Sequence, residues 1–219
     1  MKVKEYLKNN RRRIMMSLCG VIICAVSVGV FKLAALGVDP FQSLMAGLDA
    51  LIPIEFGTLY VIVNAILLLF SLIVDRHSIG IATFINLFLL GYITQFTYDL
   101  LQKLVPDSSM VVRILCLAIG IVVICFGSAL YMTADLGVST YDAVAIVMSS
   151  KWKLGKFKYI RICTDLVCVV IGCVLFVLAG NAIGKIPTIA GVGTIITAFF
   201  MGPLIDFFNE KFAKPLLRK

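Results

Sequence analysis

Residues 80–96 read GIATFINLFLLGYITQF, and residues 191–207 read GVGTIITAFFMGPLIDF. Both follow the pattern G-x-x-T-x-I-x-x-F-x-x-G-x-x-x-x-F, with six identities in seventeen positions. Each stretch is almost wholly apolar and lies in a run long enough for a membrane helix of about 20 residues. The sequence therefore predicts two related halves, each with a related membrane helix near its end.

A second motif supports two internal repeats, one over about residues 14–101 and one over about residues 111–209. Leu36-Gly37-Val38 recurs as Leu136-Gly137-Val138, 100 residues later. Each half has the order long, short, long, long in its apolar runs. The expected long spans are residues 14–36, 57–74, 79–101, 111–133, 157–179 and 187–208, and the short segments are residues 41–51 and 139–150.

Composition places the chain in the lipid bilayer. Hydrophobic residues make up 61% of the chain and charged residues 15%, and the mean hydropathy is +1.04. A soluble domain is about 45–50% apolar and about 25% charged. A soluble enzyme, a nucleic-acid-binding domain and a disordered regulator are thereby excluded. We expect one membrane domain over residues 1–219, with an all-α polytopic fold of about six transmembrane helices.

The two short segments are poor membrane spans, because each has eleven or twelve residues and contains an acid, Asp49 or Asp142. They are expected to be re-entrant or interfacial helices. Three spans per half then place the two repeats in inverted orientation. If both short segments crossed, the chain would instead have eight spans and parallel repeats.

Charge favours both termini in the cytoplasm of a multi-pass membrane protein. In the six-span arrangement, 16 of the 20 Lys and Arg residues lie on the inner side, including the whole stretch from Lys151 to Arg161. The net charge of +8 then reflects basic loops and tails that contact anionic lipid, and not a nucleic-acid partner.

The starts of the short helices carry the first group of candidate substrate-binding residues. Asp39 is a good N-cap, Pro40 suits the first helical position, and Gln42 stands where a capping box would place it. In the second half, Ser139 is the cap and Asp142 follows three residues later. Free N–H groups at a helix start favour a small polar or anionic solute. The alternative is a pair of interfacial helices with apolar faces.

Asn64 and Asp165 complete the set of candidate substrate-binding residues, at similar depths in equivalent spans. A charge in hydrocarbon costs about 2.5–3.5 kcal/mol on insertion scales, so Asp165 is a functional candidate. An ion pair with Arg161, one turn earlier, is the structural alternative.

No catalytic residue, metal site or cofactor is expected, and the protein is not expected to be an enzyme. The seven cysteines lie inside apolar stretches without metal-site spacing, and the single histidine, His77, has no partner at such spacing. Neither a nucleotide loop nor a Ser-His-Asp constellation is present.

At these motifs the chain resembles the YczE/YyaS/YitT group of bacterial integral membrane proteins, closest to the YczE-like branch. The resemblance is carried by Leu36 to Phe41, by Leu136 to Tyr141 and by the Gly-x-x-Thr stretches at Gly80 and Gly191. The second copy has Thr140 in place of the proline. The resemblance implies a bacterial inner-membrane protein of several helices and supplies no substrate.

Three functions remain open. The first is a small-solute transporter or channel with its site between the repeats. The second is a non-transporting membrane partner or scaffold protein, and the third is a substrate-binding subunit of a larger transporter. A homodimer or another membrane partner is compatible with each of them.

Overall fold

The computed structural model describes residues 10–74, 79–106, 109–155 and 157–218, and these residues form helices without any strand. Six helical segments in this part of the chain are long and apolar enough to cross a membrane. The all-α polytopic fold expected from the sequence is confirmed. The long helices are α2 (Arg11–Ala34), α4 (Phe56–Val74), α5 (Ile81–Leu104), α6 (Met110–Ala134), α8 (Phe157–Leu178) and α9 (Val192–Phe208).

Shorter elements complete the chain. They are α3 (Pro40–Leu51), α7 (Thr140–Ile146) with a π-helical turn at Val147–Lys151, a 3-10 helix at Ile183–Thr188, a π-helical turn at Asn209–Ala213 and α10 (Lys214–Arg218). The last long helix begins later than the predicted residue 187. Extended backbone at Gly191 separates the 3-10 helix from α9, which starts at Val192.

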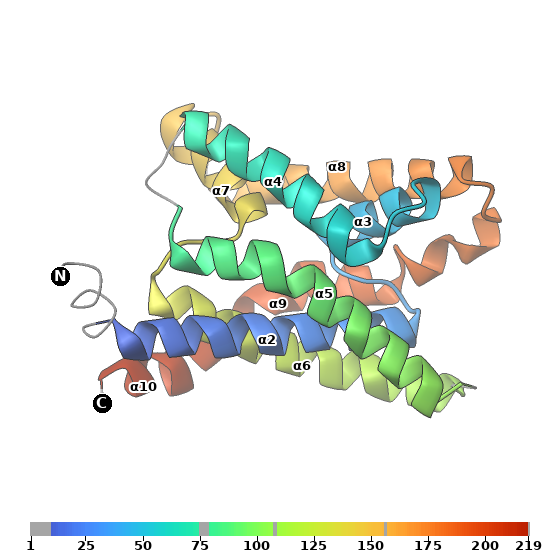
Figure 1. Ribbon diagram of the computed structural model, residues 1–219, viewed down its shortest axis with the longest axis horizontal. Coiled ribbons are helices and arrows are strands. Elements are labelled where there is room, and N and C mark those ends of the chain that lie inside the picture. Colours follow the sequence, from blue (N-terminus) through green and yellow to red (C-terminus); the bar gives the residue numbers. More distant parts are fainter. Residues whose placement is uncertain (1–9, 75–78, 107–108, 156, 219) are drawn as a thin grey trace.

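Helices α2 and α6 pack against each other in opposite directions (Figure 1). A Cβ added to Gly20 would lie 2.7 Å from the carbonyl oxygen of Gly127, so this crossing is close. At the exchanged positions, the Ser27 hydroxyl donates to the carbonyl oxygen of Gly120 at 2.7 Å. The contact of Gly20 on α2 with Gly127 on α6 thus has a counterpart in the contact of Gly120 on α6 with Ser27 on α2. The two contacts are related by a shift of 100 residues and an exchange of the two helices.

The helix ends show the same exchange. The Arg113 guanidinium at the start of α6 donates to the carbonyl oxygens of Ala34 and Ala35 at the end of α2, both at 2.6 Å. At the other end, Arg13 of α2 donates to the carbonyl oxygen of Ala134 at 3.4 Å. Each arginine thus satisfies carbonyls that a helix end leaves without an intrahelical partner.

Each Leu-Gly-Val turn docks on the Gly-x-x-Thr start of a helix in the other half. The Thr83 hydroxyl donates to the carbonyl oxygen of Val138 at 2.7 Å. In the other half, the backbone N–H of Gly193 donates to the carbonyl oxygen of Leu36 at 2.7 Å. Gly37 and Gly137 have φ angles of +102° and +110°, which glycine adopts without steric cost. Packing between the halves therefore explains why these motifs recur in both of them.

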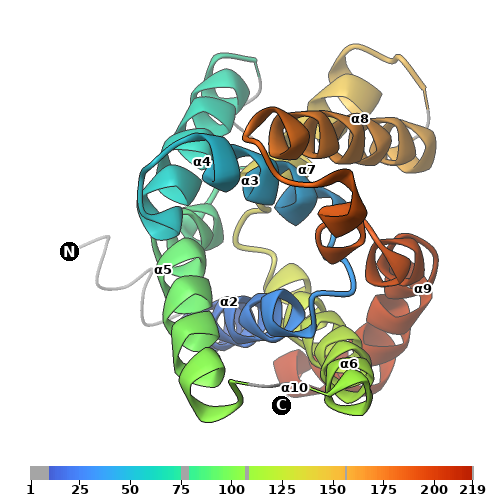
Figure 2. The same ribbon diagram turned by 90° about the vertical axis from the view of Figure 1, so that its right-hand side faces the viewer.

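The short helices start inside the bundle and not on its surface. In Figure 1, α3 and α7 begin near the middle of the molecule and run outwards to opposite ends, each after a link that turns back into the bundle. The long helices lie around them in the end-on view of Figure 2. The rings of Phe41 and Tyr141, the second residue of each helix, stack with centroids 4.9 Å apart. Both helix starts therefore lie in the interior of the bundle, as expected for re-entrant helices.

Close packing holds α3 in this place. A Cβ at Gly47 of α3 would overlap the backbone of Gly172 on α8, and a Cβ at Gly172 would overlap the backbone of Ser43. The Ser43 hydroxyl also donates to the carbonyl oxygen of Ile189 at 2.5 Å, which ties α3 to the chain before α9. The first turn of α3 is thus fixed by backbone contacts from the second half.

Candidate functional site

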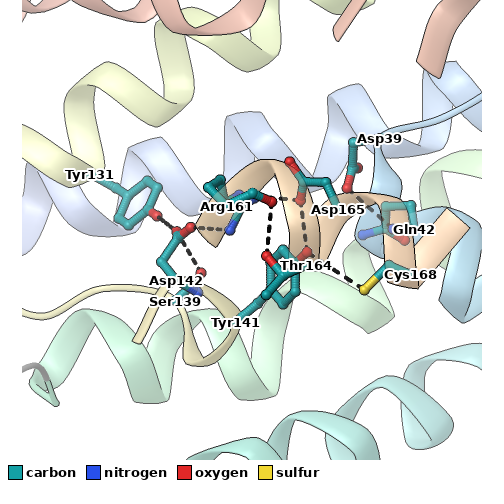
Figure 3. A network of polar contacts seen from close by, with 10 residues as sticks. All are labelled: Asp39, Gln42, Tyr131, Ser139, Tyr141, Asp142, Arg161, Thr164, Asp165 and Cys168. Carbon is teal, nitrogen blue, oxygen red and sulfur yellow. Dashed lines mark hydrogen bonds and ion pairs between the residues drawn. The ribbon is translucent and has the colours of Figure 1, made fainter. Parts of the chain in front are cut away.

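A polar network lies where the two short helices meet, and Asp142 is at one end of it (Figure 3). The Asp142 carboxylate accepts hydrogen bonds from Arg161 Nη1 at 2.5 Å and from the Ser139 hydroxyl at 2.7 Å. It also accepts from the Tyr131 hydroxyl at 3.1 Å. Three elements, α6, α7 and α8, therefore converge on one carboxylate.

Arg161 of α8 links this carboxylate to a second one. Its Nε lies 3.3 Å from Oδ1 of Asp165, one helical turn later. Its guanidinium carbon lies 4.2 Å from the centroid of the Tyr141 ring, which is a cation–π distance. The Tyr141 hydroxyl in turn donates to Oδ1 of Asp165 at 2.7 Å. The guanidinium is thereby held by two carboxylates and one aromatic face.

The spacing of residues on α8 explains why these groups point inwards. Arg161, Asp165 and Gly172 share one face of the helix. The opposite face carries Val167, Val170 and Val174, which are exposed, as expected for a face toward lipid. The protein covers the network only in part. The side chains of Arg161, Asp142 and Asp165 are 30%, 24% and 20% exposed.

Asp39 approaches the network from the start of α3. Its carboxylate accepts the backbone N–H of Gln42 at 3.2 Å, so the predicted N-cap is formed. The side-chain half of the expected capping box is not formed among the described residues, because the Gln42 amide makes no bond back to residue 39. Asp39 also interacts electrostatically with Arg161 and Asp165. The cap of α3 therefore lies within the field of the ion pairs.

The second cap is formed as well. The Ser139 hydroxyl accepts the backbone N–H of Asp142 at 3.1 Å while it donates to the carboxylate of the same residue. This one residue both starts α7 and orients the acid that binds Arg161.

Asn64 lies apart from the ion pairs. It is only 1% exposed, its Oδ1 accepts from the Thr140 hydroxyl, and its Nδ2 donates to the carbonyl oxygen of Tyr60 at 2.8 Å. These bonds fasten the start of α7 to α4. Of the six predicted site residues, five gather around the network and Asn64 has a structural position beside it. The five are Asp39, Gln42, Ser139, Asp142 and Asp165.

Sequence reasoning named Arg161 only as the structural partner of Asp165 and missed two tyrosines. The expected ion pair between Arg161 and Asp165 is formed, and Arg161 also pairs with Asp142. Tyr131 and Tyr141, which donate to the two carboxylates, were not among the candidates.

The described residues contain no group of three or more His, Cys, Asp and Glu side chains that could hold a metal ion. His77 lies outside the described residues.

Comparison with known proteins supports a membrane family. The model of a family of unknown function (DUF6198) matches residues 11–210. "Uncharacterized protein YyaS" of Bacillus subtilis (strain 168) is 24% identical over 200 residues, which cover 91% of this chain and 94% of that protein. "Uncharacterized membrane protein YczE" of the same organism is 26% identical and is covered to 81%, over 86% of this chain.

A protein of Haemophilus influenzae (strain ATCC 51907 / DSM 11121 / KW20 / Rd) is 24% identical, with 88% of this chain and 81% of the relative covered. No solved structure is significantly similar to the chain. The names YyaS and YczE agree with the resemblance found at the Leu-Gly-Val and Gly-x-x-Thr motifs. The chain is thus an integral membrane protein and belongs to the DUF6198 family.

Proposed function

We propose that this protein is a small-solute transporter or channel, with its site at the network of Asp39, Asp142, Arg161 and Asp165. The observation that carries the proposal is an ionised network between two short helix starts, inside a bundle of apolar helices. A charge within the membrane is expensive, and intramembrane ionisable groups commonly mark solute or ion pathways. A protein that only scaffolds a complex has no need of this cost.

The arrangement of the two halves supports movement around the site. Short helices that enter from opposite ends and meet in the middle are typical of transporters with inverted repeats. The halves also hold each other through two matching contacts, one at each Leu-Gly-Val turn. Rocking of one half against the other would open the site to either side in turn. The energy source we favour is an ion gradient, because no nucleotide-binding loop is present in the sequence.

We further propose that the protein lies in the inner membrane with both termini in the cytoplasm. Helix α2 begins and α10 ends at the same end of the molecule (Figure 1). The segment between α7 and α8 lies at that end, and the segment between α3 and α4 lies at the other. The first contains the exposed Leu154 and the second the exposed Ile54. In a cysteine-free background, Leu154→Cys should react with an impermeant thiol reagent only in inside-out vesicles, and Ile54→Cys only in right-side-out vesicles. The reverse pattern would contradict this orientation.

Access of water to the site tests the transport proposal. Thr164 lies on α8 beside Arg161 and Asp165 and is partly exposed. Its hydroxyl donates to the carbonyl oxygen of Arg161 and also interacts with the Tyr141 hydroxyl. In the cysteine-free background, Thr164→Cys should react with small methanethiosulfonate reagents from at least one side of the membrane. Ser71, which is fully buried, supplies a matched control as Ser71→Cys. If Cys at position 164 reacts no faster than Cys at position 71, the network is sealed and the scaffold function is favoured.

Flux separates a transporter from a binding subunit. Purified protein in liposomes should pass a small polar solute, measured as osmotic swelling for methylammonium chloride, urea and glycerol. The Arg161→Met variant should reduce this flux to that of empty liposomes. Binding without flux would favour the substrate-binding subunit of a larger transporter.

A further inference from the structure

The charges of the network do not balance. Asp39, Asp142 and Asp165 supply three carboxylates, and Arg161 is the one cation that pairs with any of them among the described residues. With all four groups ionised, the net charge of the network is minus two. The guanidinium is already engaged by Asp142, by Asp165 and by the Tyr141 ring. It therefore has little capacity left for an anionic solute.

Asp39 is the carboxylate of the three that Arg161 does not pair with. In the described part of the chain no ion pair involves this carboxylate, and its hydrogen bonds come from backbone N–H groups at the start of α3. These are the same N–H groups that a helix start would offer to an anion. Because Asp39 already occupies them, the polar or anionic solute expected from the sequence is not the one that the charges favour.

Gln42 gives an independent indication of a ligand. The residue is only 6% exposed, and its hydrogen bond in the described part of the chain is made by its backbone N–H and not by its amide. The amide atoms are not among the fully enclosed polar atoms, so they keep some surface that a ligand can contact. In Figure 3, Gln42 lies next to Asp39, on the same side of the network as Asp165, with its amide turned toward these groups. An amide oxygen beside an unpaired carboxylate is a suitable ligand set for a cation.

We propose that Asp39 and Gln42, at the start of α3 and facing Asp165, bind a small monovalent cation other than the proton. This inference rests on the proposed function and names the class of its substrate or coupling ion. The Asp39 carboxylate supplies the charge, and the Gln42 amide oxygen supplies a neutral ligand. Arg161 pairs with Asp142 and Asp165 and so keeps them from binding the cation at full strength, which leaves Asp39 as the carboxylate outside the ion pairs. One carboxylate and one amide oxygen suit a monovalent cation better than a divalent one, which needs more oxygen ligands.

Thermal unfolding of the purified protein in detergent tests this proposal. Lithium, sodium, potassium, methylammonium and choline chlorides are compared with N-methylglucamine chloride at constant ionic strength and pH. At least one cation should raise the melting temperature, because a ligand that binds only the folded state stabilises it. Asp39→Asn should weaken that binding about tenfold or more, a loss of about 1.4 kcal/mol.

The variants are matched in structure. Asparagine caps a helix about as well as aspartate, so Asp39→Asn keeps α3 while it removes the charge. Asp206 is an exposed acid on α9, away from the network, and Asp206→Asn should leave the cation effect unchanged. The inference is overturned if no cation raises the melting temperature of the unsubstituted protein, or if Asp39→Asn responds as that protein does.

Reagent charge provides a second readout at Thr164→Cys. The readout is the ratio of two reaction rates, that of a cationic methanethiosulfonate to that of an anionic one, each normalised to its rate with a free thiol. This ratio should exceed one, and Asp39→Asn should lower it. A ratio below one would overturn the cation site while leaving a water-accessible site, and hence the proposed function, in place. Failure of both reagents would instead overturn the proposed function.

Discussion

On α4, Tyr60 and Asn64 make only neutral hydrogen bonds, whereas on α8 Arg161 and Asp165, with the same spacing, form ion pairs. The two positions correspond in the predicted repeat. The starts of the short helices differ in the same sense, since Gln42 corresponds to Asp142 and Phe41 to Tyr141. The polar site is therefore concentrated in the second half.

This comparison separates features that stabilise the fold from features of the candidate site. The docking turns and the crossing of α2 with α6 are alike in both halves, so they serve the architecture. Among the described residues, the ion pairs of Arg161 lie within the second half. A purely structural repeat has no need of a costly charged network on one side, so we propose that the second half, together with Asp39, is the part under functional constraint.

The largest expected effect comes from removing the shared cation. Arg161→Met leaves the carboxylates of Asp142 and Asp165 without their partner. Breaking a buried ion pair in this way costs about 3–5 kcal/mol, and the low end, about 3 kcal/mol, applies because the groups are partly exposed. The free energy of unfolding can be measured by reversible denaturation in mixed detergent.

The neutral half supplies the control for this substitution. Tyr60→Phe removes the neutral hydrogen bonds of the Tyr60 hydroxyl to Asn86 and Asn64, and a typical neutral bond contributes about 1 kcal/mol. If Arg161→Met were no more destabilising than Tyr60→Phe, the two halves would be energetically alike and the comparison would fail.

The next effect should be the same in both halves. Gly37→Ala and Gly137→Ala place a Cβ on left-handed backbone, at about 1–2 kcal/mol, and against the start of the opposing helix. We expect each to lower the stability by about 2 kcal/mol or more. A large difference between the two variants, measured in the same denaturation assay, would show that the turns are not equivalent.

The caps should show a smaller and unequal effect. Asp39→Ala and Ser139→Ala each remove an N-cap, which costs about 0.5–2 kcal/mol. Ser139→Ala should lie at the upper end, because it also removes a hydrogen bond to the Asp142 carboxylate. Equal losses in thermal stability would mean that the second hydrogen bond contributes nothing.

Patterns within one helix were predictable, and contacts between distant helices were not. Hydropathy located the six long helices, and cap chemistry located the starts of α3 and α7, including the roles of Asp39 and Ser139. These features depend on neighbours within a few residues. The meeting of Phe41 with Tyr141 depends on how the two halves pack, which no local pattern contains.

Arg161 shows how the positive-inside rule can draw attention away from a candidate site residue. Basic residues near a helix start are normally assigned to the cytoplasmic loop, and this one follows Lys158 closely in the sequence. Its burial results from Asp142, which α7 brings to it, and from the Tyr141 ring. Asn64 shows the converse, since its depth was predicted but its partner, Thr140, comes from the other half.

The smallest net change in stability is expected from making the second half neutral like the first. The triple variant Asp142→Asn, Arg161→Met and Asp165→Asn removes the cation and both of its carboxylate partners together. Replacing a whole buried ionic group by neutral residues is often neutral or stabilising, because the cost of desolvating the charges disappears with them. The free energy of unfolding should return to within about 1 kcal/mol of the unsubstituted protein, recovering most of the loss in Arg161→Met. Solute flux should stay at the level of empty liposomes, because the ionised network that we assign to transport is gone. A triple variant that is as unstable as Arg161→Met would mean that the network holds the fold together, and one that still transports would mean that the asymmetry between the halves is not functional.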